Sequence, residues 1–289
     1  MPRWKELLLN LYYYGGYPLR NLRNSQLRTK GRAPVMVLFY HRIADDEPNA
    51  WTASNAAFER QIHWLKQHFD MVSLAEAQHR IRNGYNSRPT ITVTFDDGYA
   101  DNCQRALPFL IEQKVPCTYF VASRHILEGR PFSHDVKLGR PLAPNTPEQI
   151  RELAAAGIDI GAHTRTHADL GQVKNIDTLY DEMIGSQRDL QEITGQPVRY
   201  FAFPFGQHKN LTPAAFELAR TAFDGVCSAY GGYNFPGGDP FHFQRIHVDE
   251  DLIRLKNWVT LDPRKLRITP RYEYQTLATE LFEPVGAGA

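Results

Sequence analysis

Short apolar runs alternate with helix signals from residue 34 onward, and this alternation limits the folds that the chain can adopt. Strands and helices that alternate at this spacing predict a parallel sheet with helices outside it, either an open doubly wound sheet or a barrel. No glycine-rich phosphate-binding pattern follows any of the runs, which argues against a nucleotide-binding fold. The predicted strands are Val35–Tyr40, Thr90–Phe95, Cys117–Ala122, Ile158–Ala162, Tyr200–Phe203 and Gly225–Ala229.

The segments between these strands carry recognisable helix signals. Residues 58–69 repeat apolar side chains on one helical face. Ser73–Glu76 and Thr146–Gln149 have the pattern of a capping box, in which side chains satisfy the free N–H groups of a helix start. Thr212-Pro213 likewise predicts a helix start, with threonine as the N-cap and proline at the first helical position. A long polar helix is predicted over Asp177–Thr194.

Composition indicates an ordinary globular protein. With 42% hydrophobic residues and a formal net charge of +1, the chain of 289 residues gives no reason to expect a nucleic-acid partner. Its three cysteines form no C-x-x-C pair, so we expect unpaired thiols in a reducing compartment. We expect an N-terminal arm over residues 1–33, one domain over 34–260 and a C-terminal tail over 261–289.

The arm differs from the rest of the chain. Residues 1–33 carry seven Lys and Arg against the single acidic residue Glu6, mixed with leucine and tyrosine. This mixture is typical of a helix that lies on a membrane surface, and the alternative is that the arm packs its aromatic residues onto the domain. The arm is too polar and too broken to be a signal peptide or a membrane span. We therefore expect a cytoplasmic location, with peripheral contact to the inner membrane surface through this arm as an option.

Polar residues follow four of the predicted strands at their carboxyl ends, where the active sites of parallel α/β folds lie. His41 ends the first strand, Asp96 and Asp97 end the second, His163 and His167 follow the fourth, and Pro204-Phe205-Gly206 follows the fifth.

The two histidines are four residues apart, which is one helical turn, so both imidazoles can point at one ion. A carboxylate from another strand would complete a set of two histidines and one acid, leaving positions open for water and substrate. One of the paired aspartates can then be a ligand whose charge the metal neutralises. The other can stay ionised and take a proton from water at the metal.

The motifs "TFDDGY", "HTRTH" and "FAFPFG", in this order, resemble those of the polysaccharide deacetylases of the NodB-homology type, carbohydrate esterase family 4. The resemblance covers about residues 34–260. It implies a distorted, incomplete (β/α) barrel, usually with seven parallel strands. It also implies an enzyme that removes N-acetyl groups from a glycan with the help of a divalent metal.

The resemblance assigns roles residue by residue. It implies that Asp97, His163 and His167 hold the metal, with Zn²⁺ favoured over Co²⁺, Ni²⁺ or Fe²⁺. It further implies that Asp96 is the general base and that the backbone N–H of Phe205 stabilises the oxyanion. The resemblance leaves two histidines as candidates for the general acid. His41 is favoured because "LFYHRI" is the closer match, and His247 in "RIHVD" is the alternative.

The third motif departs from the family pattern. Many members have an arginine that orients the base, and Ala202 occupies that position here, so the partner of Asp96 is undetermined. Arg165 and Arg245 are the candidates. Further substrate contacts are predicted at Pro204, Tyr99 and Trp258.

Two alternative functions remain at this stage. One is a deformylase or deacetylase of a lipid-linked saccharide at the membrane face, which the basic arm favours. The other is a glycan-binding protein with weak or lost catalysis, which only Ala202 supports.

Overall fold

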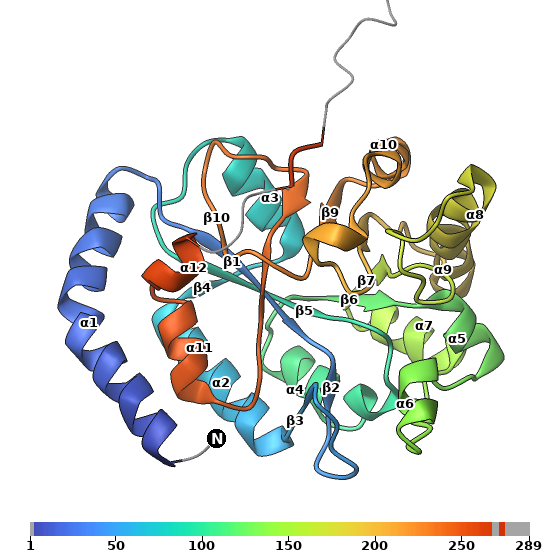
Figure 1. Cartoon of the computed structure of the whole chain (residues 1–289), viewed down its shortest axis with the longest axis horizontal. Coiled ribbons are helices and arrows are strands. Elements are labelled where there is room, and N and C mark those ends of the chain that lie inside the picture. The colour runs from blue at the N-terminus through green and yellow to red at the C-terminus, as the bar shows by residue number, and fades with distance from the viewer. Residues whose placement is uncertain (1–2, 268–271, 275–289) are drawn as a thin grey trace, which may run out of the picture.

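Parallel strands at the centre of the molecule form a curved sheet with helices on its outside (Figure 1). The computed structural model describes residues 3–267 and 272–274. Neighbouring strands of the main sheet follow the order β10-β1-β5-β6-β7-β8-β9-β11. From β1 to β9 every pairing along this order is parallel, as the strand–helix alternation predicts.

All six predicted strands form, within two residues at each end. Their side chains are buried almost throughout, which explains the unbroken apolar runs in the sequence, since helices or barrel interior cover both faces. They are β1 (Val35–Tyr40), β5 (Thr90–Phe95), β6 (Cys117–Val121), β7 (Asp159–Ala162), β8 (Tyr200–Ala202) and β9 (Gly225–Cys227).

A short segment near the end of the domain bridges the two edges of this sheet. β11 (His242–Phe243) pairs with β9, and β12 (Arg245–His247) pairs with β1 in parallel register. Only Gln244 separates these two strands, so residues 242–247 nearly close the sheet into a barrel. The expected incomplete barrel is confirmed. The remaining strands are β2 (Arg42–Ile43), β3 (Thr52–Ala53), β4 (Asp70–Met71) and β10 (Tyr233–Asn234).

The predicted helix starts are confirmed at atomic detail. Ser73 Oγ accepts a hydrogen bond from the backbone N–H of Glu76, and Thr146 forms a reciprocal capping box with Gln149. The helices around the barrel are α2 (Asn55–His68), α3 (Leu74–Arg82), α4 (Ala106–Glu112), α5 (Ser123–Glu128), α6 (Ser133–Lys137), α7 (Pro147–Ala155) and α10 (Pro213–Ala222), with short 3₁₀ turns at Ala100–Cys103 and His208–Asn210.

The predicted polar helix over Asp177–Thr194 is interrupted in the middle. It consists of α8 (Ile176–Tyr180), a π-helical turn over Asp181–Gly185 and α9 (Ser186–Thr194). Such turns insert one extra residue into a helix and are frequent at functional sites.

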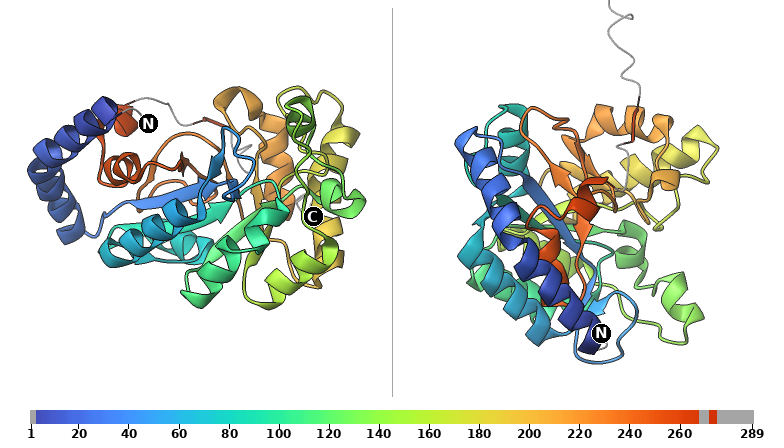
Figure 2. Two further views of the ribbon diagram at one scale, coloured as in Figure 1. Left: turned by 90° about the horizontal axis from the view of Figure 1, so that it is seen from below. Right: turned by 60° about the vertical axis from the view of Figure 1, so that its left-hand side comes forward.

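The N-terminal arm packs against a helix from late in the domain, on one side of the barrel (Figure 2). The arm forms a long helix, α1 (Arg3–Thr29), which lies against α11 (Leu252–Trp258). The first part of the predicted tail contains α12 (Pro263–Arg267), while residues 268–271 and 275–289 lie outside the described residues. No helix in the described part of the chain combines the length and the apolar character needed to cross a membrane.

Candidate active site

A cleft of about 320 Å³ opens at the carboxyl ends of the barrel strands. It contains the residues that the sequence predicts to come together: His41 from the end of β1, Asp96 and Asp97 from the end of β5, and the two histidines that follow β7. His247 of β12 faces the same cleft. The lining residues are Phe39, His41, Trp51, Asp96, Asp97, His134, His163, His167, Phe203, Phe205, Gln207, Ala229 and His247.

Asp97, His163 and His167 converge on one point. Asp97 Oδ1 lies 3.4 Å from His163 Nε2 and 3.2 Å from His167 Nε2. One potential ligand atom from each residue lies within 4.8 Å of the other two. Asp97 and His163 are buried, and His167 is largely so.

These residues fit a divalent cation. Asp97 Oδ1 is buried and has no hydrogen-bond partner, which is costly for a carboxylate unless a positive group meets it. His163 is oriented through its other ring nitrogen, because Nδ1 lies 2.8 Å from the carbonyl oxygen of Ala202. A donor at Nδ1 leaves Nε2 as a lone-pair ligand, the usual arrangement in metal sites. Two imidazoles and one carboxylate are the donors that Zn²⁺ and similar ions prefer.

The chain between the two histidines is not the helical turn that their spacing suggests. Thr164 and His167 have φ angles of 61° and 57°, so the backbone bends through the left-handed region. Glu182, from the π-helical turn, holds this bend: its Oε2 accepts hydrogen bonds of 3.0 Å from the backbone N–H groups of both Arg165 and Thr166. Its Oε1 accepts a 2.7 Å hydrogen bond from the Thr166 hydroxyl. The prediction that the two histidines meet at one point is confirmed. The loop between them, however, is held by the buried carboxylate of Glu182 and not by the hydrogen bonds of a helix.

Replacing Glu182 with alanine is therefore expected to weaken Zn²⁺ binding by about 10–100-fold, because residues that support metal ligands typically contribute that much. Isothermal titration with Zn²⁺ measures the change. Glu192→Ala, an exposed acid on α9, is the matched control. Unchanged affinity in the Glu182 variant would show that the loop keeps its shape without it.

Arg245 is the partner of Asp96. Its Nη1 and Nη2 donate hydrogen bonds of 2.7 Å to the two carboxylate oxygens of Asp96, and its Nε donates to the carbonyl oxygen of Ser228. Both side chains are buried. Burial alone would raise the pKa of Asp96, but the charge of the Arg245 guanidinium holds it below its ordinary value. Asp96 is thus ionised near neutral pH. Arg165, the other candidate, instead binds Asp181 and Asp189.

The two candidate acids lie side by side, with ring centroids 5.6 Å apart. Burial, followed by the influence of His41, lowers the pKa of His247 to about 4. Burial also lowers the pKa of His41, although the carboxylates of Asp97 and Asp96 oppose this shift.

The third motif forms a strained turn beside the candidate metal ligands. Phe205 has a φ of 59°, and its exposed ring lies 5.0 Å from that of His167. Ala202, at the position of the family arginine, is fully buried and contributes its carbonyl oxygen to His163. The guanidinium that this motif lacks is thus supplied from another strand.

The other predicted substrate contacts lie outside the cleft lining. Pro204 is adjacent to it, between Phe203 and Phe205. Trp258 ends α11, where Lys265 lies 4.6 Å from its ring. Tyr99 is fully buried, and its hydroxyl meets Trp51 and His134 behind the cleft wall. Trp51 and His134 themselves line the cleft, yet no motif in the sequence marks Trp51.

Comparison with known proteins agrees with this geometry. The family model for polysaccharide deacetylase matches residues 83–222. A poly-β-1,6-N-acetyl-D-glucosamine N-deacetylase of Staphylococcus aureus is 27% identical over 255 residues, covering 78% of this chain and 82% of that protein. YxkH of Bacillus subtilis, whose name assigns it to the polysaccharide deacetylases, is 27% identical over 193 residues. The match covers 66% of this chain but only 63% of that relative's length.

Solved structures share the fold. IcaB from Ammonifex degensii matches with a TM-score of 0.67 and 25% identity, covering 79% of this chain and 97% of that one. The deacetylase PplD of Streptococcus pyogenes matches with a TM-score of 0.66 and 21% identity, covering 78% and 98%, and this likeness concerns the fold.

A nearly closed barrel with an Asp-His-His cluster at the carboxyl ends of its strands defines the NodB-type class of α/β proteins. Within this class, the family model and the relatives are those of polysaccharide deacetylases. Over residues 83–222 the chain matches the polysaccharide deacetylase family, and these relatives and structural neighbours are named as deacetylases of this kind.

Proposed function

We propose that the chain is a hydrolase that removes N-acetyl groups from a glycan. The observation that carries this proposal is the ionised Asp96 beside the Asp97, His163 and His167 cluster in one open cleft. A glycan-binding protein has no use for a second buried carboxylate next to the ligand set. Ala202, in place of the family arginine, was the one feature that favoured a weak or inactive protein. Arg245 pairs with Asp96 instead, so Ala202 no longer supports that alternative.

The chain's own residues can carry out amide hydrolysis. Asp96 accepts the proton of the attacking water, and Arg245 keeps that carboxylate ionised and fixed in direction. The backbone N–H of Phe205 is the proposed donor to the oxyanion that forms on the amide carbonyl. When bound by Asp97, His163 and His167, a divalent cation such as Zn²⁺ supplies Lewis acidity that polarises the carbonyl and makes water more acidic.

The leaving amine needs a proton, and His41 is the proposed donor. Burial lowers the pKa of both histidines, but at His41 the carboxylates of Asp97 and Asp96 are the next largest influences and oppose the shift. At His247 the neighbouring His41 adds to the shift and the pKa falls to about 4, so His41 is the better placed of the two to hold a proton. We expect His41→Ala to lower kcat by about 10²–10⁴-fold, the usual contribution of a general acid, and His247→Ala to lower it much less. Initial rates of acetate release at saturating substrate measure both. The reverse ranking would assign the role to His247.

Acetate release from N-acetylglucosamine oligomers, with and without added Zn²⁺ or Co²⁺, tests the function. The β-1,6-linked oligomer is the first substrate to assay, since the S. aureus relatives are named for that polymer. Wild-type chain should release acetate, and Asp96→Asn should not. Oligomer binding without release would favour the glycan-binding alternative. Release of formate from a formylated saccharide, without acetate from any oligomer, would favour the deformylase alternative.

We further propose that α1 docks the protein on an anionic membrane surface. One face of this helix is attached to the domain: Tyr13 and Arg20 are buried, and Arg20 Nη1 donates a 3.0 Å hydrogen bond to Asn257 Oδ1. The opposite face bears exposed large apolar side chains, of which Leu19 is 74% exposed. They are Trp4, Leu7, Leu8, Leu11, Tyr14, Leu19 and Leu22.

Exposed basic residues lie along the same helix and favour a partner that carries negative charge. Arg3, Lys5, Arg23 and Arg28 belong to α1, and Lys30 follows it. An apolar stripe with basic side chains is the pattern of a helix that inserts its apolar face between lipids and binds acidic headgroups with its cations. Within the described residues, this arm contributes most of the exposed large apolar side chains.

Co-sedimentation with vesicles tests this docking. The full chain should bind vesicles that contain phosphatidylglycerol, bind phosphatidylcholine vesicles weakly, and lose the difference at high salt. Leu11→Glu should lower binding to anionic vesicles by about tenfold or more. Ile176→Glu, at an exposed apolar residue outside α1, should leave binding unchanged. Equal binding by both variants, or a stable dimer held by this face in light scattering, would overturn the proposal.

A further inference from the structure

Trp51 forms part of the cleft wall although it belongs to no recognised motif. It is half-buried, and its indole lies edge-on to the imidazole of His134, with ring centroids 5.0 Å apart. The His134 ring in turn lies 5.8 Å from that of the metal ligand His167. Trp51 is therefore one side chain removed from the metal cluster, on the wall that a neighbouring part of the substrate would meet.

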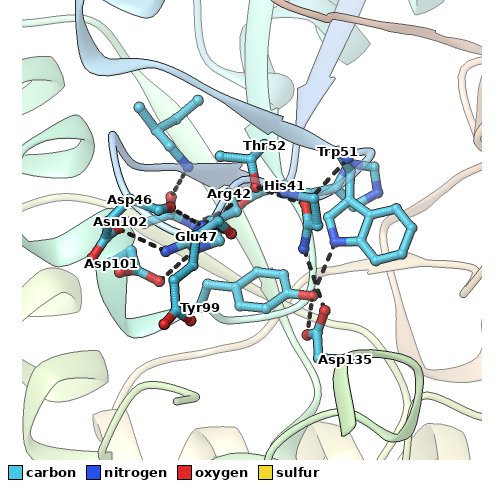
Figure 3. A network of polar contacts seen from close by, with 12 residues as sticks. His41, Arg42, Asp46, Glu47, Trp51, Thr52, Tyr99, Asp101, Asn102 and Asp135 are labelled. Atoms are coloured by element: carbon cyan, nitrogen blue, oxygen red, sulfur yellow. Dashed lines mark hydrogen bonds and ion pairs between the residues drawn. The ribbon is translucent and has the colours of Figure 1, made fainter. Parts of the chain in front are cut away.

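A chain of buried hydrogen bonds fixes the direction of this indole (Figure 3). Trp51 Nε1 donates to the hydroxyl of Tyr99 at 3.2 Å, and that hydroxyl donates to Asp135 Oδ2 at 2.8 Å. Tyr99 and Asp135 are fully buried. Asp135 is further held by Asn49 Nδ2 at 3.3 Å and by His134 at 3.5 Å, and in the described part of the chain no Lys or Arg pairs with it.

Burying a carboxylate without a full cationic partner is expensive, so its hydrogen bonds must be kept. Each partner of Asp135 consequently has a fixed place. The Tyr99 hydroxyl has one proton, which it gives to Asp135, so it can only accept from Trp51 and His134. The hydrogen bonds of Tyr99 and Asp135 thus orient both Trp51 and His134 in the cleft wall.

The loop that carries Trp51 is braced from its other side by Arg42. This buried guanidinium donates to the carbonyl oxygens of Asp46 and Glu47 and forms a 2.7 Å ion pair with Asp101 (Figure 3). β2 and β3 close the base of the same loop. The hydrogen bonds of Arg42 and those of Tyr99 and Asp135 therefore hold this loop and its tryptophan in one conformation. A rigid aromatic ring in a cleft is a preorganised binding surface, because little entropy is lost when a ligand packs against it.

We propose that Trp51 is a stacking platform for the sugar residue next to the one that is deacetylated, and that Tyr99 and Asp135 are positioning residues for it. This inference rests on the proposed glycan substrate. The indole lines the cleft, its Nε1 is already bonded to the Tyr99 hydroxyl, and a flat indole matches the C–H face of a sugar ring. The platform makes the enzyme prefer oligomers over a single sugar.

Kinetics and direct binding together test the platform. Trp51→Ala should raise KM for an N-acetylglucosamine tetramer by about tenfold, with kcat changed less than about threefold and Zn²⁺ content unchanged. Deacetylation of the monomer should fall much less than that of the tetramer. Trp51→Phe, which keeps a flat ring, should recover most of the affinity. Tyr99→Phe, which removes only the hydroxyl, should raise KM by an intermediate factor.

Tetramer binding measured by tryptophan fluorescence separates this proposal from the proposed function. The wild-type signal should change on binding, and the change should disappear in Trp51→Phe but persist in Trp258→Phe. If wild-type chain releases no acetate, this binding experiment still decides the role of Trp51. A fluorescence change that survives in Trp51→Phe, or a Trp51→Ala variant with unaltered KM for the tetramer, would overturn the platform.

Discussion

Replacing Asp97 with alanine is expected to remove the divalent cation from the chain and to lower acetate release by at least about 10³-fold. The carboxylate is the only anionic member of the candidate ligand set, and its Oδ1 has no other hydrogen-bond partner. A Lewis acid contributes several kcal/mol of transition-state stabilisation, and each 1.36 kcal/mol corresponds to about tenfold in rate. Metal analysis after dialysis against Zn²⁺, together with the acetate assay, measures both effects.

Asp96→Asn is the matched control for this experiment. It removes the adjacent carboxylate, so it should abolish turnover while leaving the bound cation in place. If Asp97→Ala and His163→Ala both retain the ion and the activity, the cluster is not the metal site and the proposed chemistry fails. The pair of variants also separates the two aspartates, which the sequence alone assigns only through the family resemblance.

Replacing Arg245 with methionine is expected to destabilise the fold by about 3–5 kcal/mol, because the Asp96 carboxylate would remain buried without its partner. Urea unfolding measures the loss. Adding Asp96→Asn to Arg245→Met should restore most of the stability, since the double variant no longer buries an uncompensated charge. Neither variant should be active.

Arg105→Met is the control, because this exposed arginine pairs with Glu59 at the surface and its loss should change stability little. If Arg245→Met unfolds at the same urea concentration as the wild-type chain, the ion pair does not hold Asp96 in the charged form. The second arginine near the histidines, Arg165, is already engaged by Asp181 and Asp189 and offers no substitute.

Much of the fold could be predicted from the sequence because its signals are local. The strands are continuous apolar runs buried on both faces, and the caps at Ser73, Thr146 and Thr212 are short side-chain patterns. The convergence of Asp97, His163 and His167 also follows from local information, since the carboxyl ends of parallel strands meet at one edge.

The rest depends on contacts between distant parts of the chain. Arg245 and Asp96 are 149 residues apart, and β12 is too short to give a strand pattern. The bend between the two histidines is set by Glu182 from a π-helical turn, which has no clear signature in sequence. Trp51 carries no sequence signal for the same reason, because its placement depends on Tyr99 and Asp135 and not on its neighbours in the chain.

Residues 242–247 carry Arg245 and His247 on the segment that bridges the two edges of the barrel. The guanidinium that pairs with Asp96, the proposed base, is therefore carried by the segment that closes the barrel and not by the third-motif turn, which is the proposed donor to the oxyanion. Searches for active relatives that demand an arginine ahead of the third-motif proline would discard chains built like this one. An arginine two residues before a histidine, in a strand that pairs with β1, is the feature by which such chains should be sorted.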